Sequence, residues 1–198
     1  MKKRQIELKR QTTETVVNVK LNIDGNGDAQ LNTGVNFFNH LLGALTKHSL
    51  FNLKVDAKSI TAADEHHIIE DVGITLGQAL DSALGNKAGI RRFGYSMVPM
   101  DDSLVAVAVD ISGRGYTTIQ ADFERRTLGD MATELIPHFL ESFALNGKFT
   151  LHVNLLYGKN DHHKAEAIFK ALGVALGSAT QFEPRLKGKV PSQKGAIS

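Results

Sequence analysis

The chain of 198 residues contains one distinctive pattern twice. Residues 66–70 read His-His-Ile-Ile-Glu, and residues 162–166 read His-His-Lys-Ala-Glu. A further histidine precedes each copy at a similar separation, His40 in one case and His138 in the other. The flanking sequences also match, as in Leu-Gly-Gln-Ala-Leu and Leu-Gly-Val-Ala-Leu. This repeat predicts two similar halves, residues 1–88 and 89–182, followed by an irregular tail at 183–198.

Hydrophobic periodicity predicts the same kinds of element in both halves. Alternating apolar and polar residues predict strands, in the first half at 14–23, 28–32 and 50–57, and in the second near 94–99, 103–111, 115–121 and 149–157. Helical spacing of apolar residues predicts helices at 36–48, 64–84, 130–145 and 160–180. The turn sequence Asp24-Gly-Asn-Gly predicts a hairpin that returns the strand at 28–32 onto 14–23. Asp64, and either Asn160 or Asp161, are the expected helix N-caps.

Each half is therefore expected to be an α+β unit. Its sheet should be small and mostly antiparallel, with two helices packed on one face. This is the arrangement known from domain 2 of ribosomal protein S5.

The composition limits which ligands and partners the chain can have. The chain has no cysteine, so disulfides and thiolate ligands are excluded, and any metal has to be held by imidazole and carboxylate groups. No apolar run approaches the about 18–20 residues that span a membrane, and the charged N-terminus lacks the apolar core of a signal peptide, so a cytoplasmic location is expected. The net charge of +2 does not point to nucleic acid. Basic residues in the tail could serve an anion: Arg185, Lys187, Lys189 and Lys194.

The spacing within the repeated pattern is suited to metal binding. Each residue of an α-helix advances by about 100°, so His66 and Glu70 share a face and can chelate one ion. His67 diverges enough to serve a different ion. The second copy has the same geometry at 162–166.

The candidate ligand set has eight members: His40, His66, His67, Glu70, His138, His162, His163 and Glu166. Imidazoles with two carboxylates suit Mn, Fe, Co or Zn better than Ca or Mg, and the sequence does not choose among the four. If adjacent histidines serve different ions, the sites lie between subunits, which predicts an obligate homo-oligomer.

Several motifs resemble one enzyme family over essentially the whole chain. They are Arg10-Gln-Thr-Thr-Glu14, Phe37-Phe-Asn-His40, Asp64-Glu-His66-His67-Ile-Ile-Glu70, Gly89-Ile-Arg-Arg92, Asp110-Ile-Ser-Gly-Arg114, His138-Phe-Leu-Glu-Ser-Phe, Asp161-His162-His163-Lys-Ala-Glu166, Phe169-Lys170-Ala and Pro191-Ser192-Gln-Lys194. In this order they resemble imidazoleglycerol-phosphate dehydratases, enzymes of histidine biosynthesis, in the monofunctional form. Asn39 stands where Asp is usual, and the segment 58–63 is atypical, but neither departure touches a ligand position.

The resemblance implies a duplicated α+β fold that assembles into a 24-subunit shell. It also implies two Mn²⁺ ions per active site, held between subunits by the eight positions above. It carries over a phosphate pocket, formed by Arg92, Arg114, Lys170, Ser192 and Lys194. His40 and His48 are further possible substrate contacts, although His48 could simply interact with a helix C-terminus.

The resemblance also implies roles in the reaction. The substrate would be imidazole glycerol phosphate, and the products imidazole acetol phosphate and water, through an imidazolate and a diazafulvene-like intermediate that the two metals stabilise. Glu14 is the expected acid/base and substrate contact, although the residues alone, without the resemblance, favour a surface carboxylate at a strand end. Glu70 and Glu166 are ligands first that could also move protons.

Two other kinds of function also fit parts of the pattern. A dinuclear metal-dependent phosphoester hydrolase would use paired metals and basic residues, but usually with several aspartates. A non-enzymatic metal-binding protein would explain the His/Glu set but not Arg92, Arg114, Lys170 and Lys194. A nucleic-acid-binding module is disfavoured by the near-neutral charge and the absence of Trp.

Overall fold

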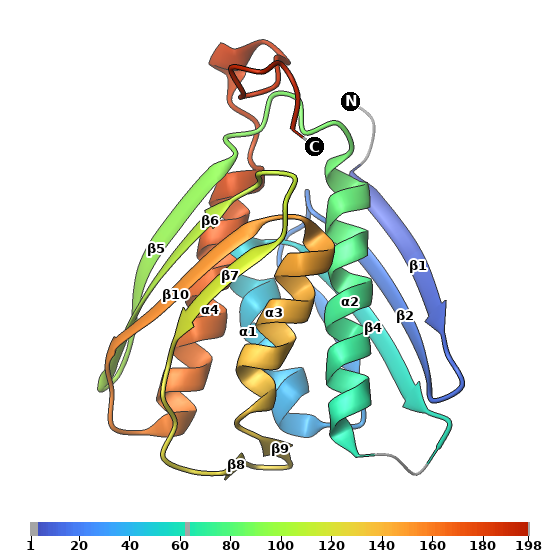
Figure 1. Cartoon of the computed structure of the whole chain (residues 1–198), viewed down its shortest axis with the longest axis vertical. Helices are drawn as coiled ribbons and strands as arrows, with labels where there is room; N and C mark the ends of the chain where they lie inside the picture. Colours follow the sequence, from blue (N-terminus) through green and yellow to red (C-terminus); the bar gives the residue numbers. More distant parts are fainter. Residues whose placement is uncertain (1–3, 62–63, 198) are drawn as a thin grey trace.

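The computed structural model describes residues 4–61 and 64–197 and contains two similar α+β halves (Figure 1). The first half comprises β1 (Gln5–Gln11), β2 (Thr15–Asn22), β3 (Ala29–Asn32), α1 (Asn36–Ser49), β4 (Asn52–Ser59) and α2 (Glu65–Leu84). The second comprises β5 (Phe93–Met100), β6 (Ser103–Asp110), β7 (Tyr116–Gln120), the short strands β8 (Thr127–Leu128) and β9 (Met131–Ala132), α3 (Leu135–Gly147), β10 (Thr150–Tyr157) and α4 (Asp161–Thr180). A 3-10 turn, η1 (Pro184–Leu186), interrupts an otherwise irregular tail.

The two halves have the same sheet topology. The strand orders are β1-β2-β4-β3 and β5-β6-β10-β7, and in each sheet the last pair is parallel and the others antiparallel. Each sheet packs its inner face against the helices of its own half, so four helices lie between two sheets (Figure 1). The expected α+β duplication with helices on one sheet face is confirmed.

The predicted hairpin between 14–23 and 28–32 is wrong. β3 pairs in parallel with β4, and β2 pairs with β1 and β4 instead. The turn at 24–28 is held by the side chain of Asn52, whose Oδ1 accepts hydrogen bonds from the backbone N–H groups of Asn26, Gly27 and Asp28. These hydrogen bonds direct the chain past β4, so that β3 lies at the sheet edge. The residues of the turn alone do not predict this contact with Asn52.

Two other local expectations differ from the structure. β1 is an edge strand that the sequence reading missed, although Ile6 and Leu8 alternate with polar residues as a strand requires. The helix expected at 130–145 begins only at Leu135, because residues 127–132 form the β8–β9 hairpin. The long helices were placed correctly, and Asp64 and Asn160 cap them by accepting from the N–H groups of His66 and His162.

The helices pair across the two halves. α2 packs on α3, and α1 packs on α4, around a continuous core that includes Phe38, Phe139 and Phe169. These helix contacts explain why the repeated Leu-Gly contains glycine. A Cβ at Gly77 would lie 2.6 Å from Phe143 O, and one at Gly173 would lie 2.5 Å from Leu45 O. Glycine at these positions lets the backbones of the two halves come into contact.

The four long helices run in the same direction. Their N-termini gather at one end of the molecule, next to β8 and β9, while the C-terminal tail lies at the opposite end (Figure 1). The repeated His/Glu pattern occupies the N-terminal turns of α2 and α4, so both copies lie at the same end of the molecule.

Candidate metal centre

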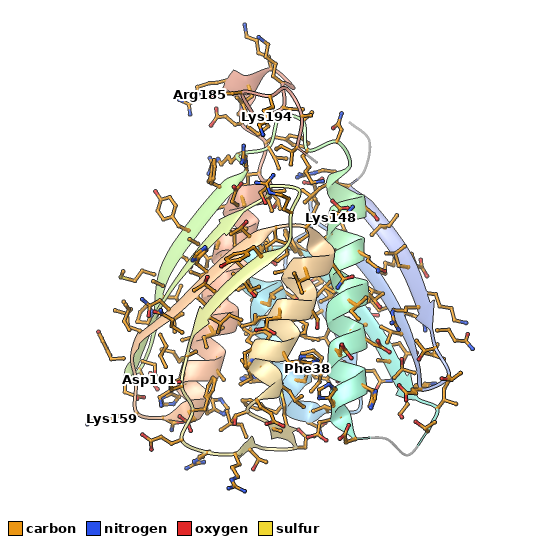
Figure 2. All side chains as sticks on the ribbon, viewed as in Figure 1. Phe38, Asp101, Lys148, Lys159, Arg185 and Lys194 are labelled. Carbon is orange, nitrogen blue, oxygen red and sulfur yellow. The ribbon has the colours of Figure 1, made fainter. Side chains whose placement is uncertain are left out.

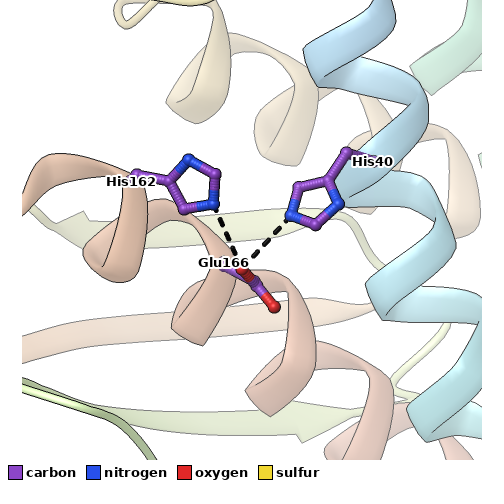
Figure 3. A group of neighbouring side chains, drawn as sticks. All are labelled: His40, His162 and Glu166. Atoms are coloured by element: carbon purple, nitrogen blue, oxygen red, sulfur yellow. Dashed lines mark hydrogen bonds and ion pairs between the residues drawn. The ribbon is translucent and has the colours of Figure 1, made fainter.

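One cluster of candidate ligands joins α1 to α4. His40 from α1 meets His162 and Glu166 from α4, as Figure 3 shows. Glu166 Oε2 lies 3.2 Å from His40 Nε2 and 3.3 Å from His162 Nε2. The Glu166 side chain is only 12% exposed, while the two imidazoles remain nearly half exposed. The carboxylate is thus fixed beneath two accessible nitrogen donors.

A second cluster joins α2 to α3. It contains His66 and Glu70 from α2 and His138 from α3, and in both clusters the candidate ligand atoms lie within 4.8 Å of one another. His138 Nε2 is 3.7 Å from Glu70 Oε1, and its ring lies 4.5 Å from the ring of His66. This Nε2 is buried and has no hydrogen-bond partner among the described residues. An orphaned imidazole nitrogen facing a carboxylate is suited to a divalent cation.

Each cluster takes residues from both halves of the chain. His40 belongs to the first half and joins the second copy of the repeat, whereas His138 belongs to the second half and joins the first copy. The upstream histidine of each half therefore does not join the His-His-x-x-Glu pattern of the same half. The cross-half pairing of the helices decides which upstream histidine meets which pair.

Glu166 is held in its anionic form. Burial would raise the pKa of its carboxyl, but hydrogen bonds from Lys170 and His40 outweigh that effect and bring the pKa below its usual value. Lys170 Nζ lies 2.8 Å from Glu166 Oε1, one helical turn along α4. The predicted position of Lys170, within one helical turn of Glu166, is confirmed.

The second histidine of each pair points away from these clusters. His67 Nδ1 lies 3.0 Å from Glu14 Oε2, and His163 Nδ1 lies 2.5 Å from Asp102 Oδ1. Asp102 did not figure in the sequence reading. It directly precedes β6 as Glu14 directly precedes β2, so an alignment of the two halves would have found it.

The turn that carries Glu14 is anchored on α2. The Thr15 hydroxyl donates to Asp71, and Arg10 Nη1 lies 2.9 Å from the other carboxylate oxygen of Asp71. Asp71 is almost fully buried and follows Glu70 directly. The β1–β2 turn therefore keeps a constant position relative to the second cluster.

Most of the expected phosphate ligands lie away from both clusters. Figure 2 places Lys194 at the end of the molecule opposite to Asp101 and Lys159, which lie near the helix N-termini. Arg92 shares the Lys194 end, because its Nη1 donates to Pro191 O at 2.9 Å while its Nε donates to Asp110. Ser192 accepts from the backbone of Lys194, and Arg114 is exposed in the loop after β6. Of these five residues, only Lys170 lies next to a His/Glu cluster of its own chain.

His48 lies near the C-terminus of α1. Partial desolvation, together with the nearby charge of Lys170, lowers the pKa of its imidazole. His48 is therefore neutral at neutral pH, which argues against the favourable interaction of a charged imidazole with the helix dipole.

None of the helices in the described ranges is long and apolar enough to cross a membrane.

Comparisons with known proteins agree with this geometry. The family model for imidazoleglycerol-phosphate dehydratase matches residues 33–176. The imidazoleglycerol-phosphate dehydratase of Dehalococcoides mccartyi is 50% identical over 197 residues, covering 100% of this chain and 99% of that protein. The enzyme of the same name from Chloroflexus aggregans is 51% identical over 194 residues, covering 98% and 95%.

Two solved structures are also similar. The crystal structure of imidazoleglycerol-phosphate dehydratase from Staphylococcus aureus aligns with a TM-score of 0.80 at 36% identity, over 90% of this chain and 100% of that one. That of the Pyrococcus furiosus enzyme aligns with a TM-score of 0.82 at 33% identity, over 96% and 100%. The chain therefore belongs to the imidazoleglycerol-phosphate dehydratase family, and is a hydro-lyase of histidine biosynthesis.

Proposed function

We propose that this chain dehydrates imidazole glycerol phosphate to imidazole acetol phosphate at a centre of two Mn²⁺ ions. The observation that carries the proposal is the pair of three-residue His/Glu clusters at one end of the helices. The ligands would be the eight residues His40, His66, His67, Glu70, His138, His162, His163 and Glu166. Two ions bound to the imidazole nitrogens of the substrate would supply Lewis acidity that favours an imidazolate and then a diazafulvene-like intermediate.

Glu14 is the proposed acid/base of the reaction. Its side chain is 48% exposed, and it sits on a turn anchored to the helix that carries His66 and Glu70. An exposed carboxylate can reach a substrate and exchange protons with water. Glu70 and Glu166, as ligands, are proposed to move protons only in a secondary role, and His40 and His48 to contact the substrate.

Lys170, Arg92, Arg114, Ser192 and Lys194 are proposed to bind the substrate phosphate. Guanidinium groups offer forked donors to phosphate, and ammonium groups act as point charges. Because Arg92 and Lys194 lie at the end of the chain opposite to the clusters, these residues would reach a metal centre on another subunit. The tail at 183–198 would then close the phosphate pocket of a neighbour.

A homo-oligomer, of 24 subunits by analogy with the family, is therefore part of the proposal. His67 and His163 point away from the clusters within their own chain, as expected if they serve ions held with other subunits. The division into repeats at 1–88 and 89–182 and a cytoplasmic location belong to the same proposal.

The outer faces of the two sheets also support association between copies. On the second sheet the exposed positions of β5 include the large apolar side chains of Phe93, Tyr95 and Met97, and Tyr95 is 81% exposed. The strand registers align these positions with Gln5, Glu7 and Lys9 on the first sheet. The second sheet is thus apolar at positions where the first sheet carries polar or charged side chains, and exposed apolar patches mark interaction surfaces.

The test is product formation from imidazole glycerol phosphate by metal-free protein to which Mn²⁺ is returned. We expect metal-dependent imidazole acetol phosphate, and its loss in Glu70→Ala. Release of inorganic phosphate instead would favour the hydrolase alternative. Mn²⁺ binding without either product would leave a metal-binding protein, and no Mn²⁺ binding would overturn the metal centre itself.

A further inference from the structure

The duplication gives each diverging histidine a carboxylate at an equivalent place. His67 and His163 are the third residues of α2 and α4, and their partners, Glu14 and Asp102, directly precede β2 and β6. In both pairs a carboxylate oxygen meets Nδ1 of the imidazole, at 3.0 Å for Glu14 and 2.5 Å for Asp102. The two halves therefore share one carboxylate–imidazole arrangement.

The two carboxylates differ in how firmly they are held. Asp102 Oδ2 accepts hydrogen bonds from the backbone N–H groups of Lys159 and Asn160, at 2.5 and 2.9 Å. These two residues directly precede α4, so Asp102 ties β6 to the helix start that carries His163. Within the described part of the chain no backbone N–H donates to the Glu14 carboxylate, and its side chain is 48% exposed, against 32% for Asp102.

We propose that Asp102 is a positioning residue of the metal centre, which orients the His163 imidazole through Nδ1 and presents Nε2 as the metal donor. A carboxylate on the far nitrogen fixes the tautomer and orientation of a ligating imidazole and increases its basicity. Glu14, the counterpart in the first half, lacks the backbone anchors and so keeps the freedom that proton transfer needs. The duplicated carboxylates have thus taken different roles. This inference rests on the proposed metal centre.

Mn²⁺ titration of the metal-free full chain, with free Mn²⁺ followed by electron paramagnetic resonance, tests the proposal. In Asp102→Asn we expect about half of the sites to bind Mn²⁺ about 10- to 100-fold more weakly. Turnover at saturating Mn²⁺ should largely recover, because the residue acts through the ligand. Glu7→Gln is the control: Glu7 lies on β1, is 74% exposed and pairs with Lys20, away from every candidate ligand. Its Mn²⁺ affinity should be that of the wild type.

A double-mutant cycle separates positioning from general structural damage. Adding Asp102→Asn to His163→Gln should change Mn²⁺ affinity little further, since the histidine through which Asp102 acts has gone. Independent, multiplying losses would overturn the proposal, as would wild-type affinity in Asp102→Asn or an equal loss in Glu7→Gln. If Asp102→Asn does not fold, Asp102→Ser carries the same expectation. Absence of Mn²⁺ binding by the wild type would instead refute the metal centre.

Discussion

At the residue scale, Glu14 and Asp81 show how much the surroundings of a carboxylate decide what it does. Glu14 is half exposed and meets only the imidazole of His67 in the described part of the chain. Asp81, near the end of α2, lies 2.7 Å from Lys87 Nζ and 2.8 Å from Lys148 Nζ. The first is accessible to solvent, and the second links a lysine of each half.

Replacing Glu14 by Gln should reduce turnover and leave the metal centre intact. The amide keeps the shape of the side chain but cannot accept a proton, so we expect kcat to fall by about 10²- to 10⁴-fold. Mn²⁺ affinity should stay within a few-fold of the wild type, as measured on the same preparation. Glu7→Gln, an exposed acid on β1, is the control and should retain full activity. Parallel losses of Mn²⁺ affinity and kcat would instead make Glu14 a ligand.

Asp81 should stabilise the fold in a pH-dependent way. Burial would raise the pKa of its carboxyl, but hydrogen bonds from Lys148 and Lys87 outweigh it and lower the pKa below 3.8. A depressed folded-state pKa contributes stability that is fully present above 3.8 and is lost as the pH falls further, through the folded-state pKa.

We therefore expect Asp81→Asn to cost about 2 kcal/mol near neutral pH, because it leaves the nearly buried Lys87 without its charged partner. The difference in thermal unfolding midpoint between wild type and variant should shrink as the pH drops below 3.8. Protomer concentration has to be kept equal in both samples. A difference that does not change with pH would show that the charge of Asp81 is not what stabilises the fold.

At the scale of the elements, close approach of helices from different halves shapes the clusters. α2 approaches α3 at Gly77, where the nearest atoms to an added Cβ are the backbone groups Phe143 O and Gly147 N, both at 2.6 Å. The same helix pair carries His66, Glu70 and His138 on its first turns. A small residue midway along the helix thus sets how near the ligands come.

Gly77→Ala should force α2 and α3 apart. Backbone atoms cannot move aside as a flexible side chain would, so we expect a loss of about 1–3 kcal/mol in unfolding free energy, together with weaker Mn²⁺ binding. Gly43→Ala on α1 is the matched control, because its added Cβ would meet only Leu31 Cδ1 at 3.8 Å. That variant should be neutral, or more stable by about 0.5–1 kcal/mol. Equal effects of the two substitutions would contradict the steric explanation.

At the scale of the whole molecule, the two outer sheet faces differ in the kind of side chain that they expose. Phe93, Tyr95 and Met97 on β5 occupy the register positions that Gln5, Glu7 and Lys9 occupy on β1. The inner faces of both sheets are buried alike. The duplication has therefore kept the core and changed one outer face.

Tyr95→Glu should disrupt the assembly. A charge placed in the middle of an apolar contact should cost about 2 kcal/mol or more per interface, so sedimentation velocity should show smaller species at micromolar protomer concentration. Glu7→Lys, at the register-equivalent position of the first sheet, should leave the assembly unchanged. An unaltered sedimentation profile for Tyr95→Glu would show that the outer face of the second sheet is not the contact.

Local features of the sequence were sufficient for much of the fold. The long helices and their N-caps at Asp64 and Asn160 follow from periodicity and capping, which act over a few residues. The shared face of His162 and Glu166 follows from helix geometry in the same way. Local features could not predict that β3 pairs with β4. The turn before β3 is held by the side chain of Asn52, which lies more than 20 residues further along the chain.

The sequence by itself determined that the chain is a duplicated α+β protein with two His/Glu pairs, because repeats, periodicity and helical spacing are local properties. Only the tertiary structure decided that His40 joins the second pair and His138 the first, since cross-half helix packing brings these residues together. It also decided that Arg92 and Lys194 lie at the end opposite to the clusters. These are contacts between distant segments, which depend on how whole elements pack and not on the residues beside them in the chain.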